Sequence, residues 1–342
     1  MAKKIQVSDD SGSNWYTLPG SEGELTREAG QIEDTIFGQT FTSNDRGLIT
    51  WSVTANAVYK GYVGYKASLK KQGSSTAFTG EAASLVSGKR YKIADATKNM
   101  WNRAVAISVF DGVTDVTAQV EAINYLFGEV VFLASYTVLG SITVTGAYFP
   151  LTSLAKANSY TLTQTAAEIP TGHFDLVQAN GGYMTHDPGL RVVGLELTGI
   201  FDVASTLAAA LLAGTELVVE INPDGAGKSR SRGFFRTTNA GQSGDVGALE
   251  EETFSLSLNV PEGVEFPYIW SHTGDTPIPL AVRKLLDAWS NETKLDVRYL
   301  HNGVLGQEGA AVVTDVSLEG SMDAMNVFSV TLLGDGVLTA VV

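Results

Sequence analysis

The stretches LVVEINPDG (217–225) and LDVRYLHNG (295–303) show the same succession of residue types within one chain. In each, a run of apolar and β-branched residues ends in a polar turn that closes on glycine, which is typical of a strand entering a hairpin. A helix candidate precedes each strand, at 203–214 and at 279–291. Self-similarity over this length predicts two copies of one structural unit.

The similarity extends outward from these two stretches. Downstream, FSLSL (254–258) corresponds to FSVTL (328–332), and upstream GLITWSVTANA (47–57) corresponds to GLRVVGLELTG (189–199). Apolar and polar residues alternate in the 47–57 stretch, which predicts a strand with one buried face. A repeat in sequence does not fix which strands pair. One unit split around the other, and two units that follow one another in sequence with strands exchanged, both remain open.

The simplest organisation has three domains. We expect one unit from residues 1–70 together with 264–342, a second from 156–263, and an inserted β-domain from 71–155. The expected fold class is mainly β with a few short helices (α+β), with two units that form β-sandwiches or barrels and a small sandwich-like insert. The strands expected in the insert are Arg90–Ile93, Val105–Phe110, Ile123–Leu126, Glu129–Phe132 and Ser141–Tyr148.

Composition excludes several classes of function. The 342 residues carry 37 acidic and 23 basic side chains, a net charge of −14, which argues against a surface that grips phosphate backbones and is compatible with a conduit for DNA. The absence of cysteine excludes disulfides and thiolate metal sites, and the four histidines are too scattered for a zinc centre. No signal peptide or apolar membrane span is expected, so the chain is predicted to act without a membrane and to be made in the cytosol.

No motif nominates a catalytic residue. The acidic clusters at 9–10, 22–24 and 250–252 lie in polar segments and are interpreted as solvated surface. No GxSxG pattern occurs. The GKS at 227–229 lacks the first glycine of a phosphate-binding loop, which four residues separate from the GK pair, because Asn222 stands there. The sequence therefore predicts no enzyme activity and no cofactor.

Tryptophans and one basic segment suggest packing and contact positions. Trp51, Trp101, Trp270 and Trp289 are predicted to lie in the core. Trp15 stands on a polar N-terminal segment, where it suits either local packing or an anchor on another subunit. The predicted hairpin tip around 222–233 carries three basic residues that are candidates for a subunit contact: Lys228, Arg230 and Arg232.

Two long stretches resemble a known family. GAAVVTDVSLEGSMDAMNVFSVTLLGDGVLT (309–339) and GQIEDTIFGQTFTSNDRGLITWSVTANAVYKGY (30–62) are similar to the closing strands and to the N-terminal strand and long loop of major tail tube proteins. These are virion proteins of long-tailed, siphovirus-type bacteriophages. Together with the repeated unit, the resemblance covers most of the chain, whereas the insert departs from the family pattern.

The resemblance implies a structural protein that polymerises into coaxially stacked rings. Sheets of adjacent subunits would line a tube that conducts DNA into the host cell during ejection. If six units make a ring, a chain with two units forms a homotrimeric ring with pseudo-sixfold symmetry. A homohexameric ring is the alternative. Implied partners are the tape measure protein, the tail terminator and passing DNA that is not specifically bound. The implied location is the virion tail, and the protein would be made in the host bacterial cytoplasm.

Two loops occupy equivalent places in the two repeats, 36–46 and 174–188. Both mix aromatic with polar residues, so we expect them to connect one ring to the next. The candidate contact residues are Phe37, Phe41, Arg46, Tyr183 and His186.

A second hypothesis is a carbohydrate- or receptor-binding β-protein of the adhesin type, in which the 78–148 module presents loops to a ligand. This hypothesis predicts monomers that bind glycans.

Overall fold

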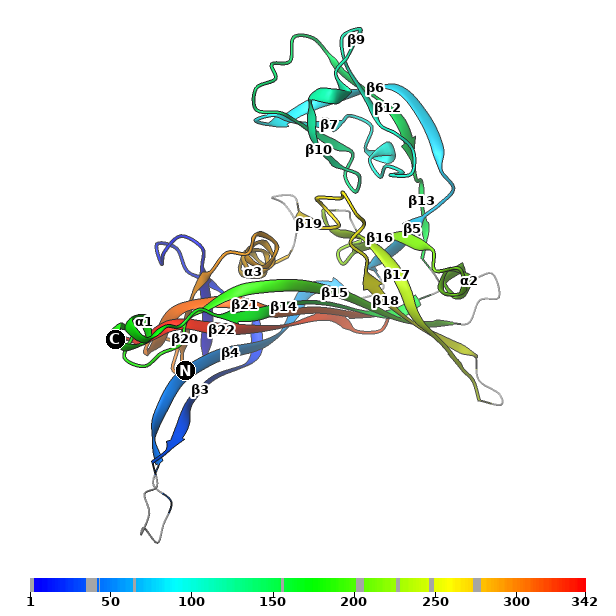
Figure 1. The fold of residues 1–342 in the computed structure, drawn as a ribbon. Coiled ribbons are helices and arrows are strands. Elements are labelled where there is room, and N and C mark those ends of the chain that lie inside the picture. The colour runs from blue at the N-terminus through cyan, green and yellow to red at the C-terminus, as the bar shows by residue number, and fades with distance from the viewer. Residues whose placement is uncertain are drawn as a thin grey trace. The chain divides into compact units, whose positions relative to one another are not determined.

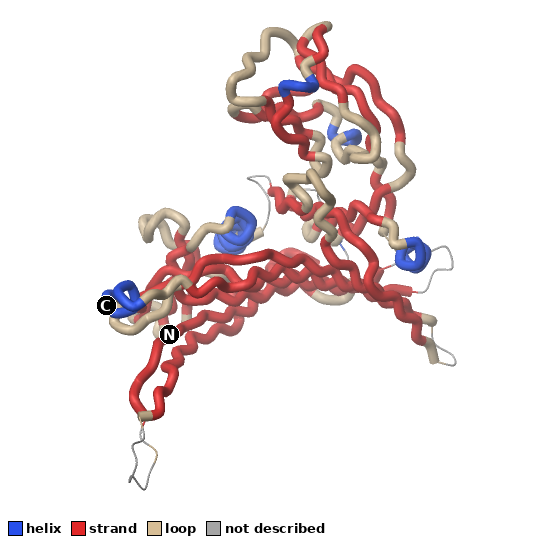
Figure 2. The backbone as a smooth tube through the Cα atoms, viewed as in Figure 1, coloured by secondary structure: helices blue, strands red, loops and turns tan. Residues whose placement is uncertain are grey.

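The structure, a computed structural model, describes all residues except 1–2, 35–41, 43, 64–65, 155–156, 201–205, 226–227, 246–248 and 273–277. Strands account for 61% of it and helices for 10%, and Figure 2 shows how strands dominate the described chain. The predicted fold class, mainly β with a few short helices, is therefore confirmed.

Two compact units divide the chain. Unit 1 comprises 1–66, 159–196 and 274–342, and unit 2 comprises 67–158 and 197–273. These units group segments by their contacts, so the three predicted domains and their boundaries stay a prediction.

Unit 1 is built from long antiparallel strands and two helices (Figure 1). Its elements are β1 (Lys4–Ser8), β2 (Tyr16–Thr17), β3 (Gly20–Glu33), β4 (Asn44–Val63), β14 (Ala157–Pro170), α1 (Phe174–Ala179), β15 (His186–Ile200), α3 (Leu280–Asn291), β20 (Leu295–Leu300), β21 (Gly306–Ser321) and β22 (Met325–Val341). Strand β15 continues from unit 1 into unit 2. Helix α3 begins after Pro279, within one residue of the start of the helix candidate at 279–291, and proline is common at such a helix start.

Unit 2 contains a second set of strands and one helix. Its elements outside the insert are β5 (Ser68–Gln72), β13 (Leu151–Ser153), α2 (Thr206–Ala213), β16 (Glu216–Asn222), β17 (Ser229–Ser243), β18 (Glu251–Leu258) and β19 (Tyr268–His272). Helix α2 ends at Gly214, whose φ of +61° is the left-handed conformation that glycine adopts most readily.

The insert forms one seven-stranded antiparallel sheet in the order β10-β11-β7-β6-β12-β8-β9. Two of its strands coincide with the predicted spans, and turn glycines Gly112 and Gly128 have positive φ as hairpin glycines do. The strands are β6 (Thr76–Ser87), β7 (Arg90–Ile93), β8 (Ser108–Asp111), β9 (Thr114–Asp115), β10 (Val120–Asn124), β11 (Glu129–Phe132) and β12 (Ile142–Tyr148), with short 3₁₀ turns η2 (Ala96–Lys98) and η3 (Thr117–Gln119).

The four tryptophans predicted to lie in the core are all buried. Trp51 on β4 shows why the neighbouring strands carry glycines. Its ring lies directly against Gly334 of β22, and its Nε1 donates a hydrogen bond to the Gly336 carbonyl at 2.9 Å. A side chain at position 334 would occupy the space of the indole ring, so the close packing of the sheet requires glycine there.

Two sets of seven strands have the same order. The first copy (residues 4–63 and 280–341) runs β3-β4-β22-β21-β20-β1-β2, and the second copy (residues 68–72 and 151–258) runs β14-β15-β18-β17-β16-β5-β13. The second copy is inserted in sequence between β4 and α3 of the first. The seven-stranded sheet is in turn inserted between β5 and β13 of the second copy.

Local irregularities coincide in the two copies. The β21–β22 ladder shifts register between Val313 and Asp315, and the β17–β18 ladder shifts between Thr237 and Asn239. Each shift lies the same distance from the preceding hairpin, since Ala311 faces Leu295 and Phe235 faces Leu217. Bulges of this kind are specific structural features, so their coincidence supports a duplicated unit.

Register corrects one detail of the sequence comparison. The bulges place Ser255 at the position of Thr331, because Ser255 faces Asn239 and Thr331 faces Asp315. The correspondence of FSLSL with FSVTL is therefore shifted by two residues along the strand. A shift of two leaves the same side chains facing the core, which is why the sequence pattern alone did not reveal it.

Candidate assembly interface

A ladder between the two copies exists inside the chain. Strand β14 of the second copy pairs with the C-terminal half of β21 of the first copy, from Ser159 opposite Ser321 to Thr165 opposite Asp315. Leu162 and Leu318 face each other in this ladder and are both almost completely buried. Each copy keeps its own seven strands, and the β14–β21 ladder joins the edge of one copy to the edge of the other.

The two corresponding edges, β3 of the first copy and residues 237–243 of β17 in the second, form no such ladder in the described part of the chain. Among the described residues, β3, the counterpart of β14, pairs with β4 alone. Residues 237–243 of β17 are the counterpart of the half of β21 that pairs with β14. On one edge they pair with β18. On the other edge β16 reaches only residues 231–236, so no described strand pairs with residues 237–243 there. An edge strand exposes main-chain N–H and C=O groups that favour pairing with another chain.

The two faces of the unit 1 sheet differ sharply in chemistry. One row of directly paired residues reads Glu22, Asn56, Ser329, Ser317 and Thr163, across β3, β4, β22, β21 and β14. The adjacent row, on the opposite face, contains the buried Ala55, Val330 and Val316. In this row the first face is thus polar across all five strands, and we call it the polar face.

The polar face carries acidic but no basic residues along these strands. A second row on it reads Glu24, Thr54, Thr331, Asp315 and Thr165. In the paired segments 22–28, 50–56, 159–165, 315–321 and 327–333, all of them described, no lysine or arginine lies on this face. Partial burial raises the pKa of Asp315 on this face.

Three of the five residues predicted to connect rings are described, and they lie close to one another in unit 1. Phe37 and Phe41 lie outside the described residues. The exposed Arg46 lies near the turn before Tyr183, with its Nη2 3.5 Å from the Gly181 carbonyl. Ile49 of β4 forms a bridge with Tyr183. Arg46 and the neighbouring part of β4 thus contact the second predicted loop, and the role of both loops between rings stays a prediction.

His186 differs from the other two because its side chain is buried. Its Nδ1 lies 2.9 Å from the Gly334 carbonyl, and its main-chain N–H donates to Asp335 at 2.8 Å. In the monomer this imidazole holds β15 against β22. The His186 imidazole therefore cannot itself contact a neighbouring ring of subunits. It would act only by fixing the position of the 174–188 loop.

The predicted subunit contacts occupy different environments. Trp15 is half-buried, and the Arg298 guanidinium lies 4.0 Å from the centre of its ring, so local packing is present in the monomer. Lys228 and Arg230 are partly exposed. Arg232 is 1% exposed and forms an ion pair with Glu220 at 2.6 Å, so in this chain it acts inside unit 2.

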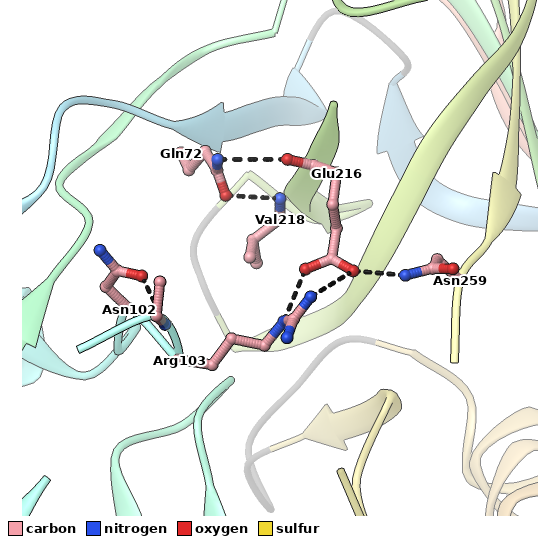
Figure 3. A network of polar contacts seen from close by, with 7 residues as sticks. Gln72, Asn102, Arg103, Glu216, Val218 and Asn259 are labelled. Carbon is pink, nitrogen blue, oxygen red and sulfur yellow. Dashed lines mark hydrogen bonds and ion pairs between the residues drawn. The ribbon is translucent and has the colours of Figure 1, made fainter. Parts of the chain in front are cut away.

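A polar network within unit 2 attaches the insert to β16 (Figure 3). Arg103 donates to both carboxylate oxygens of Glu216, at 2.8 and 3.2 Å, and Asn259 donates to the same carboxylate. Gln72 of β5 accepts from the Val218 N–H at 2.8 Å. The carboxylate of Glu216 raises the pKa of Arg103, as expected for a paired guanidinium.

Arg232 forms the buried counterpart of this network. Its Nη1 donates to Asn99 Oδ1 at 2.9 Å and to the Leu126 carbonyl at 2.5 Å, and its guanidinium lies 4.6 Å from the centre of the Phe127 ring. Leu126 and Phe127 belong to an apolar cluster that also includes Phe234. Together these contacts fix the insert to the strands of unit 2.

Sequence reasoning missed Arg103, Glu216 and Gln72. Arg103 and Glu216 are 113 residues apart, and neither belongs to a motif, so no local signal identified them. The only available signal was indirect. Glu216 begins an apolar strand, and a carboxylate at such a place needs a charged or hydrogen-bonding partner when other parts of the protein pack over the strand.

Neither metal-ligating clusters nor spanning helices were found in the described part of the chain. No group of three or more His, Asp or Glu side chains that could hold a metal ion occurs there. No helix within the described ranges is long and apolar enough to cross a membrane. A pocket between β1, β3 and β4 is lined by residues that include Lys3, Glu22 and Tyr299.

No family model matches the chain, and no curated protein matches it. Among solved structures, a chain in the virion of a native gene transfer agent particle matches with a TM-score of 0.29 and 14% identity, over 36% of this chain and 89% of that chain. A chain in the tail of an empty gene transfer agent particle, which has C6 symmetry, matches with a TM-score of 0.30 and 14% identity, over 36% of this chain and 87% of that chain. Both are partial likenesses, and at these scores they carry no argument about function.

Proposed function

We propose that this chain is a structural virion protein of a phage-type tail, which polymerises into stacked rings that form the tail tube. The observation that carries the proposal is the pairing of its two copies. A β14–β21 ladder joins one copy to the other inside the chain. Among the described residues, the corresponding edges of β3 and of residues 237–243 in β17 pair with no further strand. Such head-to-tail edges generate rings when the rotation between copies closes.

The polar face supports a tube that conducts DNA. The two rows of Ser, Thr, Asn, Asp and Glu on this face, without Lys or Arg, repel phosphates and offer no ion pairs to them. Double-stranded DNA would therefore pass along it without specific binding. In this proposal the polar face lines the lumen, and the opposite, apolar face packs against the helices and loops of the subunit wall.

Ring composition follows from the duplication. If the ring has six copies of the unit, three chains supply them, which gives a homotrimer with pseudo-sixfold symmetry. A homohexameric ring of whole chains is the alternative. The tape measure protein in the lumen and the tail terminator at the end of the tube are the further partners we propose.

Contacts between rings are assigned to the loops 36–46 and 174–188. Within the second loop, helix α1 exposes Phe174 almost completely, an unusual position for an aromatic side chain unless a partner covers it. Deletion of residues 38–45 tests this assignment, because it removes most of the first loop and the last two pairs of the β3–β4 ladder, and leaves that ladder intact from the Gln31–Arg46 pair onward. Shortened or absent tubes are expected, and tubes of normal length would contradict the assignment.

Electron microscopy of the purified protein tests the proposed function. Negative staining at increasing protein concentration is expected to reveal hollow rods with a regular axial repeat. Monomers at every concentration, together with binding to a glycan array, would contradict the tube and support the carbohydrate-binding alternative.

A further inference from the structure

We propose that chains join within a ring through an antiparallel ladder between β3 of one chain and residues 237–243 of β17 in its neighbour, in the register of the internal β14–β21 ladder. This inference rests on the proposed function and specifies the contact by which it operates. The partner is a second copy of this chain, because the chain already contains one complete example of the same junction.

Strand β3 is the counterpart of β14 residue by residue. Both strands have 14 residues, and ELTREAGQIE (24–33) aligns with TLTQTAAEIP (161–170), with Leu, Thr, Ala and Ile at the same places. Packing agrees with this alignment. A Cβ added to Gly47 would lie 2.9 Å from the carbonyl oxygen of Gly30, and one added to Gly189 would lie 2.9 Å from that of Ala167. The two hairpins therefore approach in the same way at the same residues.

The C-terminal halves of β17 and β21 correspond through their bulges. Asn239 follows the bulge in one strand and Asp315 follows it in the other. Residues 239–243 therefore occupy the positions of 315–319. In β21 the edge away from β22 is occupied by β14. In β17 the edge away from β18 is the one we assign to the neighbouring chain.

Transfer of the internal register predicts each interchain pair. Inside the chain, Thr161 faces Glu319 and Leu162 faces Leu318. The equivalent residues put Glu24 opposite Ser243 and Leu25 opposite Gln242. Leu25 is only half-buried in the monomer, whereas Leu162 is completely buried, as expected if β3 still lacks its partner strand.

The interchain ladder has fewer apolar contacts than its internal template. Within the chain, Tyr160 lies against Gly320, and Leu162 faces Leu318. Between chains, glycine would replace the tyrosine, since Gly23 occupies its place, and Gln242 would replace the second leucine. The two copies in one chain are thus held firmly, while the contact between chains depends more on main-chain hydrogen bonds and forms only at high local concentration.

Disulfide cross-linking tests the register, since the chain has no cysteine of its own. We would compare three double variants under mild oxidation: Glu24→Cys with Ser243→Cys for the predicted pair, Thr161→Cys with Glu319→Cys for the internal equivalent, and Glu24→Cys with Asn239→Cys for a register shifted by four residues, or about 13 Å. Directly opposed residues in antiparallel strands meet the distance that a disulfide needs, and the shifted pair does not.

The expected result is covalent oligomers for the first variant, an intramolecular bond for the second and unlinked monomer for the third, on a denaturing gel without reductant. Monomer alone from the first variant, while the internal pair links, would overturn the ladder. Equal linking by the shifted pair would overturn the register and with it the proposal.

Electron microscopy of the same wild-type preparation separates this inference from the proposed function. Rods without cross-links from the 24/243 pair would refute the ladder and leave the tube in place. Cross-links without rods would support the ladder and contradict the tube. A second variant tests the missing apolar contact opposite Leu25. Gln242→Leu should lower the protein concentration at which rods appear about tenfold relative to the control Gln242→Asn. An unchanged concentration would contradict the pairing of residue 242 with Leu25.

Discussion

Replacement of Arg232 by alanine is expected to destabilise unit 2 strongly. The guanidinium is 1% exposed, and its ion-pair partner Glu220 is 2% exposed, so the substitution leaves a carboxylate buried without its main counter-charge. It also removes the hydrogen bonds to Asn99 and to the Leu126 carbonyl, which attach the insert. Breaking a buried ion pair from one side costs about 3–5 kcal/mol.

Urea denaturation followed by tryptophan fluorescence measures this loss. The control is Arg236→Ala on the same strand, where the arginine is exposed and a change below about 0.5 kcal/mol is expected. A double variant, Arg232→Met with Glu220→Leu, should recover most of the lost stability because no charge stays buried.

The outcome also decides the role that the sequence suggested for Arg232. If this arginine were a subunit contact, Arg232→Ala would impair assembly and leave the stability of the monomer unchanged. An unchanged unfolding midpoint would therefore contradict the assignment of Arg232 to the interior of unit 2.

Further predictions concern packing, pH and the polar face. Gly189→Val should lower stability by about 1–3 kcal/mol in thermal unfolding, since its Cβ would press on the Ala167 carbonyl, whereas Gly194→Val, with no atom within 4 Å, should not. Main-chain N–H groups lower the pKa of Asp111. The ionised carboxylate therefore stabilises the folded insert fully at neutral pH, and this stabilisation is lost as the pH falls through the lowered pKa. Asp111→Asn should destabilise the insert at pH 7 and much less in acid, as measured by unfolding at several pH values. Thr54→Lys on the polar face should make assembled tubes bind DNA at low salt and release it at high salt in a sedimentation assay, and wild-type tubes should not bind.

Much of the fold was accessible from the sequence because its signals are local. The spans of β7 and β11 were predicted residue for residue, and Trp51 and its alternating neighbours identified a strand with one buried face. The repeat was visible where a strand, a turn and a glycine recur together, as in 217–225 and 295–303. Strand periodicity and turn chemistry depend on neighbouring residues, so one sequence suffices to detect them.

Strand partners were not accessible in the same way. Pairing of β14 with β21 rests on main-chain hydrogen bonds that any residue except proline can make, so no side-chain pattern announces it. The β1 and β5 strands are equivalent in the sheet order, yet KIQVS and SLKKQ share no pattern.

Burial of Arg232 was missed for a related reason. The polar run around it is typical of an exposed hairpin tip, and its hydrogen-bond partner Asn99 lies 133 residues earlier in the chain. Only the folded insert turns this arginine into an internal residue. The sequence therefore located the basic segment correctly and could not distinguish which of its side chains would be covered.

The symmetry of the assembled ring is the decisive observable for a duplicated ring subunit. Cryo-electron microscopy of rods formed by the wild-type protein should give a reconstruction with threefold symmetry, in which each chain supplies two neighbouring copies and six similar copies surround the lumen. A ring of six whole chains would contradict the duplicated subunit, because the second copy would then not complete the ring in the way that the internal β14–β21 ladder predicts.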